Sequence, residues 1–367
     1  MENPLALVMG SCQLARIISD NIIKMKIIKK TDLNLIKSKL KNIYINLNEL
    51  LEELINQKKV IVICGPTCTG KSRIGIILAK LLNTDIISVD SIQIYKGMDI
   101  GTDKHDTKKY NLKQYMTSIF NPDHYVTVVE FRDICRKIIE DEFFFKDKIP
   151  ILVGGSGLYI RGVIDDLDFF PGRDKIIRNE LKENIKKYGL SVYYEKLKKI
   201  DSTYSKKISI NDERRIIRAL EVYEITGKPF SFFQNKWESR KSIYNTDIFG
   251  IEVDRPELYK NIEERVNRMF EKGLVKEIKS LIEKGYKDCN SILQAVGYKE
   301  VVKYINGEIN LPECVDEVKR NTRRLAKKQM TWFKSDPRIK WIRTNSYGNI
   351  IDLIMDILNI INNSVVN

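Results

Sequence analysis

The sequence predicts an α/β fold in which a parallel sheet, built around a phosphate-binding loop (P-loop), is flanked by helices, with a helical insertion domain and a helical C-terminal part. Three observations predict it. A continuous apolar run at 60–64 leads directly into a glycine-bounded loop, further apolar runs alternate with helical segments, and strand signals fade between residues 166 and 245. The chain therefore divides into a sheet region and an inserted helical region.

The expected strands are short apolar runs that end at a polar residue or a glycine. They span residues 60–64, 86–89, 149–153 and 248–253. A helix is expected at 72–82, directly after the first loop. Strands that alternate with helices form a parallel sheet, whose ligands bind beyond the carboxyl ends of the strands. We therefore expect the functional site at that edge.

Domain boundaries follow from the change in pattern. We expect an N-terminal extension at 1–57, a P-loop domain formed by 58–165 and 246–345, a helical insertion at 166–245, and a C-terminal helix or tail at 346–367. Helical periodicity covers 175–200, 213–226 and 257–333, the last interrupted by Gly285, Gly297 and Gly307. The extension is either an organellar targeting segment or a plain leader, since its basic residues are mostly lysine.

The composition favours a polyanionic partner such as nucleic acid. Lys and Arg number 63 against 49 Asp and Glu, a net charge of +14. A lysine-rich genome would produce the same excess, so charge alone does not identify the partner. The six cysteines form no CxxC pair, which argues against a zinc site. Asp20, Lys24 and Lys26 keep the N-terminal apolar region below the roughly 18 residues of a membrane span.

A complete phosphate-loop motif, G-x-x-x-x-G-K-[ST], follows the first expected strand and opens the first expected helix. Its backbone N–H groups converge on phosphate oxygens, and Gly70 permits their close approach. Lys71 adds a positive charge, and Ser72 is placed to hold Mg²⁺. The motif alone is compatible with a nucleotide or with another phosphorylated donor. The predicted diphosphate-binding residues are Gly65, Pro66, Thr67, Cys68, Thr69, Gly70, Lys71 and Ser72.

Further motifs carry a specific resemblance. Residues 85–102 (DIISVDSIQIYKGMDIGT) resemble the second signature of the tRNA dimethylallyltransferases, which ordinary P-loop kinases lack. Other segments resemble the family in the same order, namely 151–159, 213–222, 265–269, 273–275, 296–299 and 331–333. The resemblance extends from Val60 to Ile342. It implies that the chain has the fold and the activity of this family.

The departures from the family pattern are few. Ser156 stands where the family usually has threonine, and Ile92 stands where many members have arginine. The usual pair of histidines before residues 121–123 is absent. Neither cysteine nor histidine follows Cys314, so the C-terminal zinc finger of many eukaryotic cytosolic members is missing. The chain therefore resembles the bacterial or organellar form.

The resemblance implies transfer of a dimethylallyl group from dimethylallyl diphosphate to N6 of adenosine 37 of tRNA, which gives N6-isopentenyladenosine and diphosphate. Asp90, at a strand end beside the phosphate loop, matches the family's general base. A magnesium-binding acid is the alternative role for Asp90. Arg265 resembles the arginine that neutralises the leaving diphosphate, and Ser156 is the third expected catalytic residue.

The resemblance also implies residues that contact the anticodon stem-loop of tRNA, with the target adenosine flipped out of its loop. Around the flipped base, these residues are Asp90, Ser91, Ile92, Gln93 and Ser156. In the helical insertion, they are Arg178, Arg214, Arg215 and Arg218.

A basic helix near the C-terminus supplies a further predicted tRNA surface. Six cations lie among the ten residues 319–328, with no acid among them. At 100° per residue they occupy one half of a helix, whereas Val318, Leu325 and Trp332 occupy the other. We expect the apolar half to pack and the basic half to hold the tRNA backbone; a solvated face is the alternative. The cations are Lys319, Arg320, Arg323, Arg324, Lys327 and Lys328, of which Arg323 and Lys327 are the predicted tRNA contacts.

Three alternatives stay open: an adenylate isopentenyltransferase that makes a cytokinin, a P-loop small-molecule kinase, and a non-catalytic RNA-binding protein. A small acceptor needs neither the insertion nor the basic helix, and a kinase would consume ATP. We expect Mg²⁺ as cofactor, tRNA and dimethylallyl diphosphate as partners, no membrane association, and a monomer. The expected location is the cytoplasm, or a mitochondrion or plastid if the extension is a transit segment.

Overall fold

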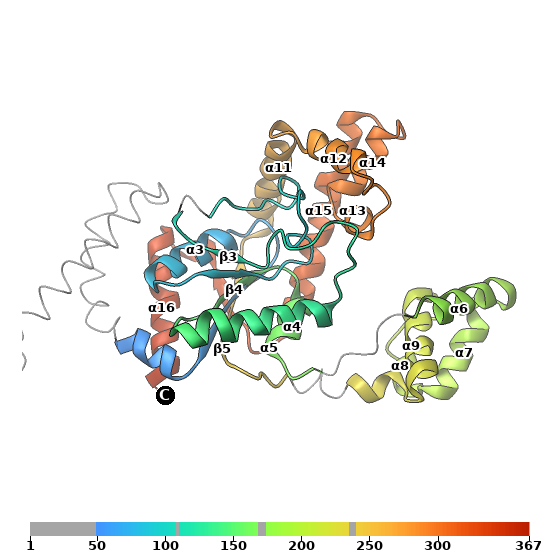
Figure 1. The fold of residues 1–367 in the computed structure, drawn as a ribbon, viewed down its shortest axis with the longest axis horizontal. Helices are drawn as coiled ribbons and strands as arrows, with labels where there is room; N and C mark the ends of the chain where they lie inside the picture. Colours follow the sequence, from blue (N-terminus) through green and yellow to red (C-terminus); the bar gives the residue numbers. More distant parts are fainter. Residues whose placement is uncertain (1–48, 108–109, 168–173, 235–239, 367) are drawn as a thin grey trace, which may run out of the picture. The chain divides into compact units, whose positions relative to one another are not determined.

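The computed structural model describes residues 49–107, 110–167, 174–234 and 240–366 (Figure 1). The chain forms two compact units, one that runs up to Val163 and resumes at Tyr244, and an inserted one at Ile164–Ile243. The insertion expected at 166–245 corresponds to the second unit. The expected N-terminal extension lies outside the described residues as far as residue 48.

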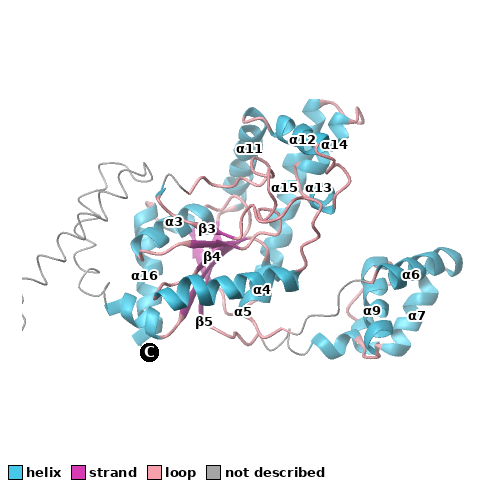
Figure 2. Ribbon diagram, in the orientation of Figure 1, coloured by secondary structure: helices cyan, strands magenta, loops and turns pink. Residues whose placement is uncertain are grey.

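The first unit is built on a six-stranded parallel sheet in the order β3-β2-β4-β1-β5-β6 (Figure 2). β1 lies in the interior between β4 and β5, so the loop that follows it opens between neighbouring strands. The strands are β1 (Lys59–Cys64), β2 (Ile86–Ser88), β3 (Gln114–Tyr115), β4 (Ile151–Gly154), β5 (Asn245–Glu252) and β6 (Lys340–Arg343).

The central strand β1 is buried along its whole length, as its continuous apolar run predicts. Ile63 pairs in register with Val153 of β4 and with Phe249 of β5. At the end of β4, a Cβ atom on Gly154 would lie 2.0 Å from the carbonyl oxygen of Val89. Only glycine therefore lets the second glycine-rich strand end approach the segment that leads to Asp90.

One face of the sheet is covered by α3 (Lys71–Leu81), by a helix at 49–56, and by α16 (Ile350–Val366). Leu54 and Ile357 are fully buried in this core. In Figure 1, α16 lies beside α3. The helix at 49–56 and α16 therefore supply apolar side chains that complete the core of the first unit.

The sequence analysis missed two strands and two α-helices of this unit. β3 has two residues and β6 has four, too few to show alternation. The missed helices are α4 (Val128–Ile138) and α5 (Gly157–Ile164). Thr127 caps the N-terminus of α4 by accepting a hydrogen bond from the N–H of Glu130. Only the pairing of β3 with β2 and of β6 with β5 defines these short strands.

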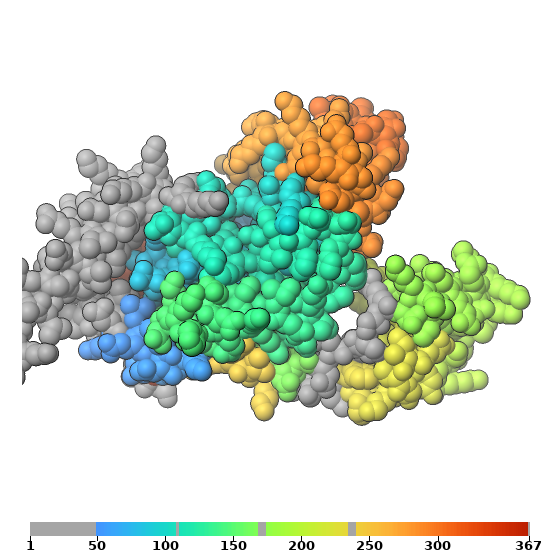
Figure 3. All heavy atoms as spheres, in the orientation of Figure 1, coloured from blue at the N-terminus to red at the C-terminus, as the bar shows by residue number. Residues whose placement is uncertain are grey.

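Five α-helices lie between β5 and β6 along the chain, and α11 packs against α15. In Figure 3 the orange atoms of this group form one continuous surface. Gly285, Gly297 and Gly307 all have positive φ and interrupt the helical run as the sequence predicts. The helices are α11 (Arg255–Glu271), α12 (Leu274–Glu283), α13 (Asn290–Gln294), α14 (Tyr298–Ile305) and α15 (Leu311–Lys334).

The inserted unit is helical and has its own apolar core. One of its helices, α9, begins after the capping side chain of Asp212 and is followed by Gly227, which has a φ of 67°. None of the described helices of the chain is long and apolar enough to cross a membrane. The helices of the unit are α6 (Lys175–Tyr188), α7 (Leu190–Ile200), α8 (Ser202–Ser205) and α9 (Glu213–Thr226).

Candidate active site

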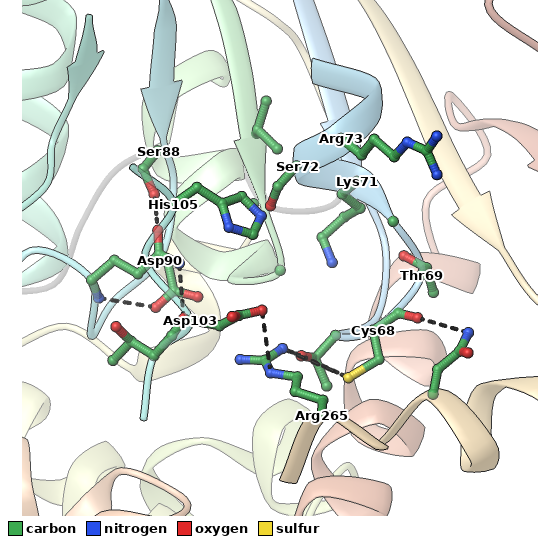
Figure 4. A pocket seen from close by; sticks show the side chains of 18 of the residues that line it. Cys68, Thr69, Lys71, Ser72, Arg73, Ser88, Asp90, Asp103, His105 and Arg265 are labelled. Carbon is green, nitrogen blue, oxygen red and sulfur yellow. Dashed lines mark hydrogen bonds and ion pairs between the residues drawn. The ribbon is translucent and has the colours of Figure 1, made fainter. Parts of the chain in front are cut away.

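A pocket of about 540 Å³ opens at the carboxyl edge of the sheet in the first unit. The phosphate loop forms one wall, the segment after β2 forms another, and α11 contributes a third (Figure 4). The predicted residues Asp90, Gln93 and Arg265 all line it together with the phosphate loop from Thr67 to Ser72. Segments far apart in the sequence thus meet at the edge where a parallel sheet binds its ligands.

The phosphate loop has the backbone that its glycines permit. Gly65 has a φ of 135°, and a Cβ atom there would lie 2.6 Å from the carbonyl oxygen of Ile251. Gly70 has a φ of 86° and directly precedes α3. The loop therefore lies against β5, and the N-terminus of α3 faces the pocket. The first N–H groups of a helix have no partner within the helix, so they can bind an anion there.

Lys71 lies inside the loop and is buried. Its ammonium group donates a hydrogen bond to the carbonyl oxygen of Pro66, which also accepts a hydrogen bond from the hydroxyl of Thr69 at 2.9 Å. Burial lowers the pKa of Lys71 to about 8. An anion bound in the loop would restore the charged form, because opposite charges stabilise each other strongly where water is excluded.

Arg265 reaches the phosphate loop from α11, as the resemblance predicts. Its Nη1 donates to Oγ1 of Thr67, and its Nε lies 3.6 Å from Oδ2 of Asp103 (Figure 4). Burial opposes the charged form, but the neighbouring Cys68 and Asp103 raise the pKa of Arg265. The guanidinium group is therefore held charged at the loop, where it can bind phosphate oxygens.

Asp90 follows β2 on the opposite side of the pocket. Its Oδ1 accepts hydrogen bonds from the N–H of Ile92 at 2.8 Å and of Gln93 at 3.3 Å. The N–H of Ser91 donates to Oγ of Ser156 at 3.2 Å. These bonds fix the carboxylate of Asp90 in the wall of the pocket, across from the phosphate loop. Its role as general base stays a prediction.

Gln93 is held at both ends of its side-chain amide. Its Oε1 accepts a hydrogen bond from the hydroxyl of Ser88 at 2.7 Å, and its Nε2 donates to the carbonyl oxygen of Thr102 at 3.0 Å. Ser91, Ile92 and Ser156 lie next to this network but outside the pocket lining. Among the predicted base-contacting residues, Asp90 and Gln93 are therefore the two that line the pocket.

The faces of α15 differ from the expected ones. The buried positions recur every four residues, at Val318, Thr322 and Ala326, whereas Leu325 is 36% exposed and Trp332 is half-buried. The expectation that Leu325 packs is therefore wrong. A basic and apolar periodicity identifies two halves of a helix, but it does not locate the line along which the neighbouring helix covers it.

The basic half of α15 also has acidic neighbours that the sequence order hides. Arg323 forms an ion pair with Glu263 of α11 at 3.2 Å, and Arg320 forms one with Glu317 at 3.3 Å. Lys327 is exposed. The role of this surface in tRNA binding stays a prediction, and Lys327 is the better placed of the two predicted contacts.

Three of the four arginines predicted to bind tRNA in the insertion pair with carboxylates. Arg178 and Arg218 both contact Glu221, at 3.4 Å and 2.8 Å, and this carboxylate is fully buried. Arg215 lies 3.4 Å from Asp212. A buried carboxylate needs charged partners, so Arg178 and Arg218 have a structural role whatever they bind. Their contact with tRNA stays a prediction.

Sequence reasoning missed a residue that joins two parts of the site. Gln329 of α15 accepts a hydrogen bond from the N–H of Thr67 at 2.9 Å and donates one to the carbonyl oxygen of Gly155 at 3.0 Å. It stands between exposed lysines and a half-buried methionine, Met330. Neither charge nor periodicity distinguishes it there, and only its position just before the motif at 331–333 could have drawn attention to it.

A phosphate loop at the edge of a parallel sheet, faced by the arginine of a distant helix and by the carboxylate after β2, defines a P-loop enzyme that acts on a phosphorylated substrate. Comparison with known proteins narrows this class. The family model described as IPP transferase matches residues 93–336, and that described as isopentenyl transferase matches residues 58–116. The chain belongs to the tRNA dimethylallyltransferase family.

Individual relatives agree with this assignment. The tRNA dimethylallyltransferase of Carboxydothermus hydrogenoformans is 46% identical over 77% of this chain and 91% of its own length. The crystal structure of a tRNA isopentenylpyrophosphate transferase from Bacillus halodurans has a TM-score of 0.62 at 37% identity and covers 84% of this chain and 97% of that one. A eukaryotic dimethylallyltransferase acting on tRNA has a TM-score of 0.66 at 28% identity, over 78% of this chain and 73% of that one.

Proposed function

We propose that this protein transfers a dimethylallyl group from dimethylallyl diphosphate to N6 of adenosine 37 in the anticodon loop of tRNA. The observation that carries the proposal is the pocket in which Asp90 faces a phosphate loop and Arg265. The names of the relatives, which specify tRNA and the dimethylallyl group, support the same acceptor and donor.

In this reaction the bond between the allylic carbon and the diphosphate oxygen breaks, and diphosphate leaves with the bonding electrons. Lys71, Arg265 and the N–H groups of the loop stabilise the charge that develops on it. The N6 amine forms the new bond to the allylic carbon, and its proton passes to the carboxylate of Asp90. Gln93 is placed to hydrogen-bond the base, since its amide lies in the wall beside Asp90.

Magnesium fits this pocket as a partner of the diphosphate. Ser72 lines the pocket at the start of α3 and supplies a hydroxyl oxygen, the kind of ligand that Mg²⁺ takes. We propose that Ser72 and the diphosphate oxygens hold Mg²⁺, with water completing its shell, as this ion prefers. When bound, Mg²⁺ would neutralise charge on the leaving diphosphate.

We further propose that tRNA is held through its anticodon stem-loop, with the target base flipped into the pocket, since an enzyme must take a stacked base out to modify its edge. That the protein acts as a monomer stays a prediction.

The decisive test is a product assay with competing acceptors. The protein is incubated with dimethylallyl diphosphate and Mg²⁺ and with unmodified tRNA, with adenosine monophosphate or with tRNA in which adenosine 37 is replaced by guanosine. Nucleosides are then analysed by mass spectrometry. We expect N6-isopentenyladenosine from the first acceptor alone. Product from the mononucleotide would indicate an adenylate isopentenyltransferase. In a parallel reaction with added ATP, consumption of the ATP would indicate a kinase.

A further inference from the structure

Glu277 of α12 lies outside the pocket lining but binds the segment that leads into it. Its carboxylate accepts hydrogen bonds from three successive backbone N–H groups, those of Asp99 at 2.9 Å, Ile100 at 2.7 Å and Gly101 at 3.2 Å. Successive N–H groups that converge in this way form a concavity that binds an anion. Here the anion is a side chain of the protein itself.

A second contact fixes this carboxylate. Oε1 of Glu277 accepts a hydrogen bond from the hydroxyl of Tyr298 at 2.6 Å, and the side chain of Tyr298 is fully buried. Burial and the charge of Glu277 raise the pKa of Tyr298, which keeps its hydroxyl a donor. A Cβ atom on Gly101 would lie 2.4 Å from the ring of Tyr298. The backbone at Gly101 therefore rests directly on this ring.

The segment held in this way touches both halves of the site. The carbonyl oxygen of Thr102 accepts the hydrogen bond from Gln93, which lies beside Asp90. The next residue, Asp103, has a φ of 54° and places Oδ2 at 3.6 Å from Nε of Arg265 (Figure 4). A left-handed backbone at a residue other than glycine persists where its surroundings hold it. The contacts of Glu277 with residues 99–101 contribute to that restraint, together with the hydrogen bond from the N–H of Asp103 to the carbonyl oxygen of Ile100.

We propose that Glu277 is a positioning residue for prenyl transfer, which acts by holding residues 99–103 so that Asp103 orients Arg265 toward the diphosphate and Thr102 orients Gln93 toward the base. This inference rests on the proposed function for its effect on turnover. Its effect on diphosphate binding follows from the contact with Arg265 alone, and it can be measured without any acceptor.

The first test is the substitution Glu277→Gln, whose amide N–H₂ group would face backbone donors. The affinity for inorganic diphosphate with Mg²⁺, measured by calorimetry, should fall roughly 10-fold, and the kcat for tRNA prenylation should fall by a similar factor. The matched control is Glu283→Gln, an exposed carboxylate on the same helix, which should change neither value. Thermal unfolding of both variants identifies any general loss of folded protein.

The second test asks whether Glu277 acts through Arg265. In an Arg265→Gln background, adding Glu277→Gln should change the diphosphate affinity by less than about 2-fold, because residues in one chain of contacts have non-additive effects. An equal fold-loss in both backgrounds would overturn the proposal, as would normal affinity and kcat in the folded Glu277→Gln protein. If the wild-type protein binds diphosphate but prenylates no tRNA, the proposed function fails while this test still stands.

Discussion

The side chain of Gln329 accepts a hydrogen bond from the backbone N–H of Thr67 and thereby joins α15 to the phosphate loop. The substitution Gln329→Leu removes this bond and the one to Gly155. Because each such bond contributes about 1 kcal/mol and about 1.4 kcal/mol corresponds to a factor of ten, we expect the Kd for dimethylallyl diphosphate to rise roughly 10- to 30-fold. Calorimetric titration measures it. Gln294→Leu, at an exposed position of α13, is the control and should bind normally.

The substitution Asp90→Asn separates the role of Asp90 as a proton acceptor from its role in holding the local backbone. Asparagine keeps the Oδ1 acceptor for the N–H groups of Ile92 and Gln93, so both substrates should still bind. The single-turnover rate should fall roughly 10²-fold or more, because the amide cannot take the proton of the amine. If extra Mg²⁺ restores the rate, Asp90 is a metal ligand instead of a base.

The lowered pKa of Lys71 predicts proton uptake when the donor binds. Near pH 8 the amine of Lys71 is neutral in about half of the free enzyme molecules. A bound diphosphate raises the pKa of Lys71 again, because it favours the ammonium form. Affinity should therefore weaken as the pH rises above 8. Calorimetry in buffers of different ionisation enthalpy should show this uptake for the wild type, and Lys71→Met should bind weakly and lack that component. Equal proton uptake by the two proteins would contradict the assignment.

The basic half of α15 yields predictions of opposite sign. Replacing Arg323 and Lys327 with glutamine should weaken tRNA binding and flatten its log–log salt dependence by about one unit per lost contact. Folding should survive, because the buried Val318, Thr322 and Ala326 are unchanged. Glu263→Gln should instead strengthen tRNA binding, since it releases Arg323 from its ion pair. Filter binding at several salt concentrations measures the slope. An unchanged slope in all variants would show that this face is solvated and does not contact tRNA.

A buried ion pair anchors the C-terminal helix to the sheet. Asp247 of β5 contacts Nζ of Lys59 at 3.0 Å and of Lys340 at 2.7 Å, and it accepts a hydrogen bond from Ser364 of α16 at 2.7 Å. Asp247→Ala would leave Lys59 buried without its carboxylate. We expect the free energy of unfolding, measured in urea, to fall by roughly 3–5 kcal/mol.

The pH dependence of this anchor has a definite sign. Burial alone would raise the pKa of Asp247, but hydrogen bonds from Lys340, Ser364 and Lys59 hold it below its usual value. The stabilisation is therefore fully present above about pH 4 and is lost as the pH falls through the lowered pKa of the folded state. Asp247→Asn should lose this part of the acid dependence, and an identical acid profile in that variant would contradict the assignment.

Local sequence determined the parts of this protein whose geometry depends on neighbours in the chain. The phosphate loop needs positive φ at Gly65 and Gly70, and it directly follows an apolar strand and opens a helix. The helix α9 begins at Glu213 and ends at Thr226 as its periodicity indicates, since Asp212 and Gly227 cap it. Such features are readable because backbone sterics and capping bonds act within a few residues.

The tertiary structure alone decided which of those features face each other. In the tertiary structure Leu325 of α15 is exposed and α16 packs into the core of the first unit. Arg178 and Arg218 form ion pairs with Glu221. The tertiary structure also brought Gln329 to Thr67, a contact between residues 262 positions apart. Periodicity shows that a helix has two faces, but which face is covered and which charge is neutralised depends on distant segments, whose packing no local pattern records.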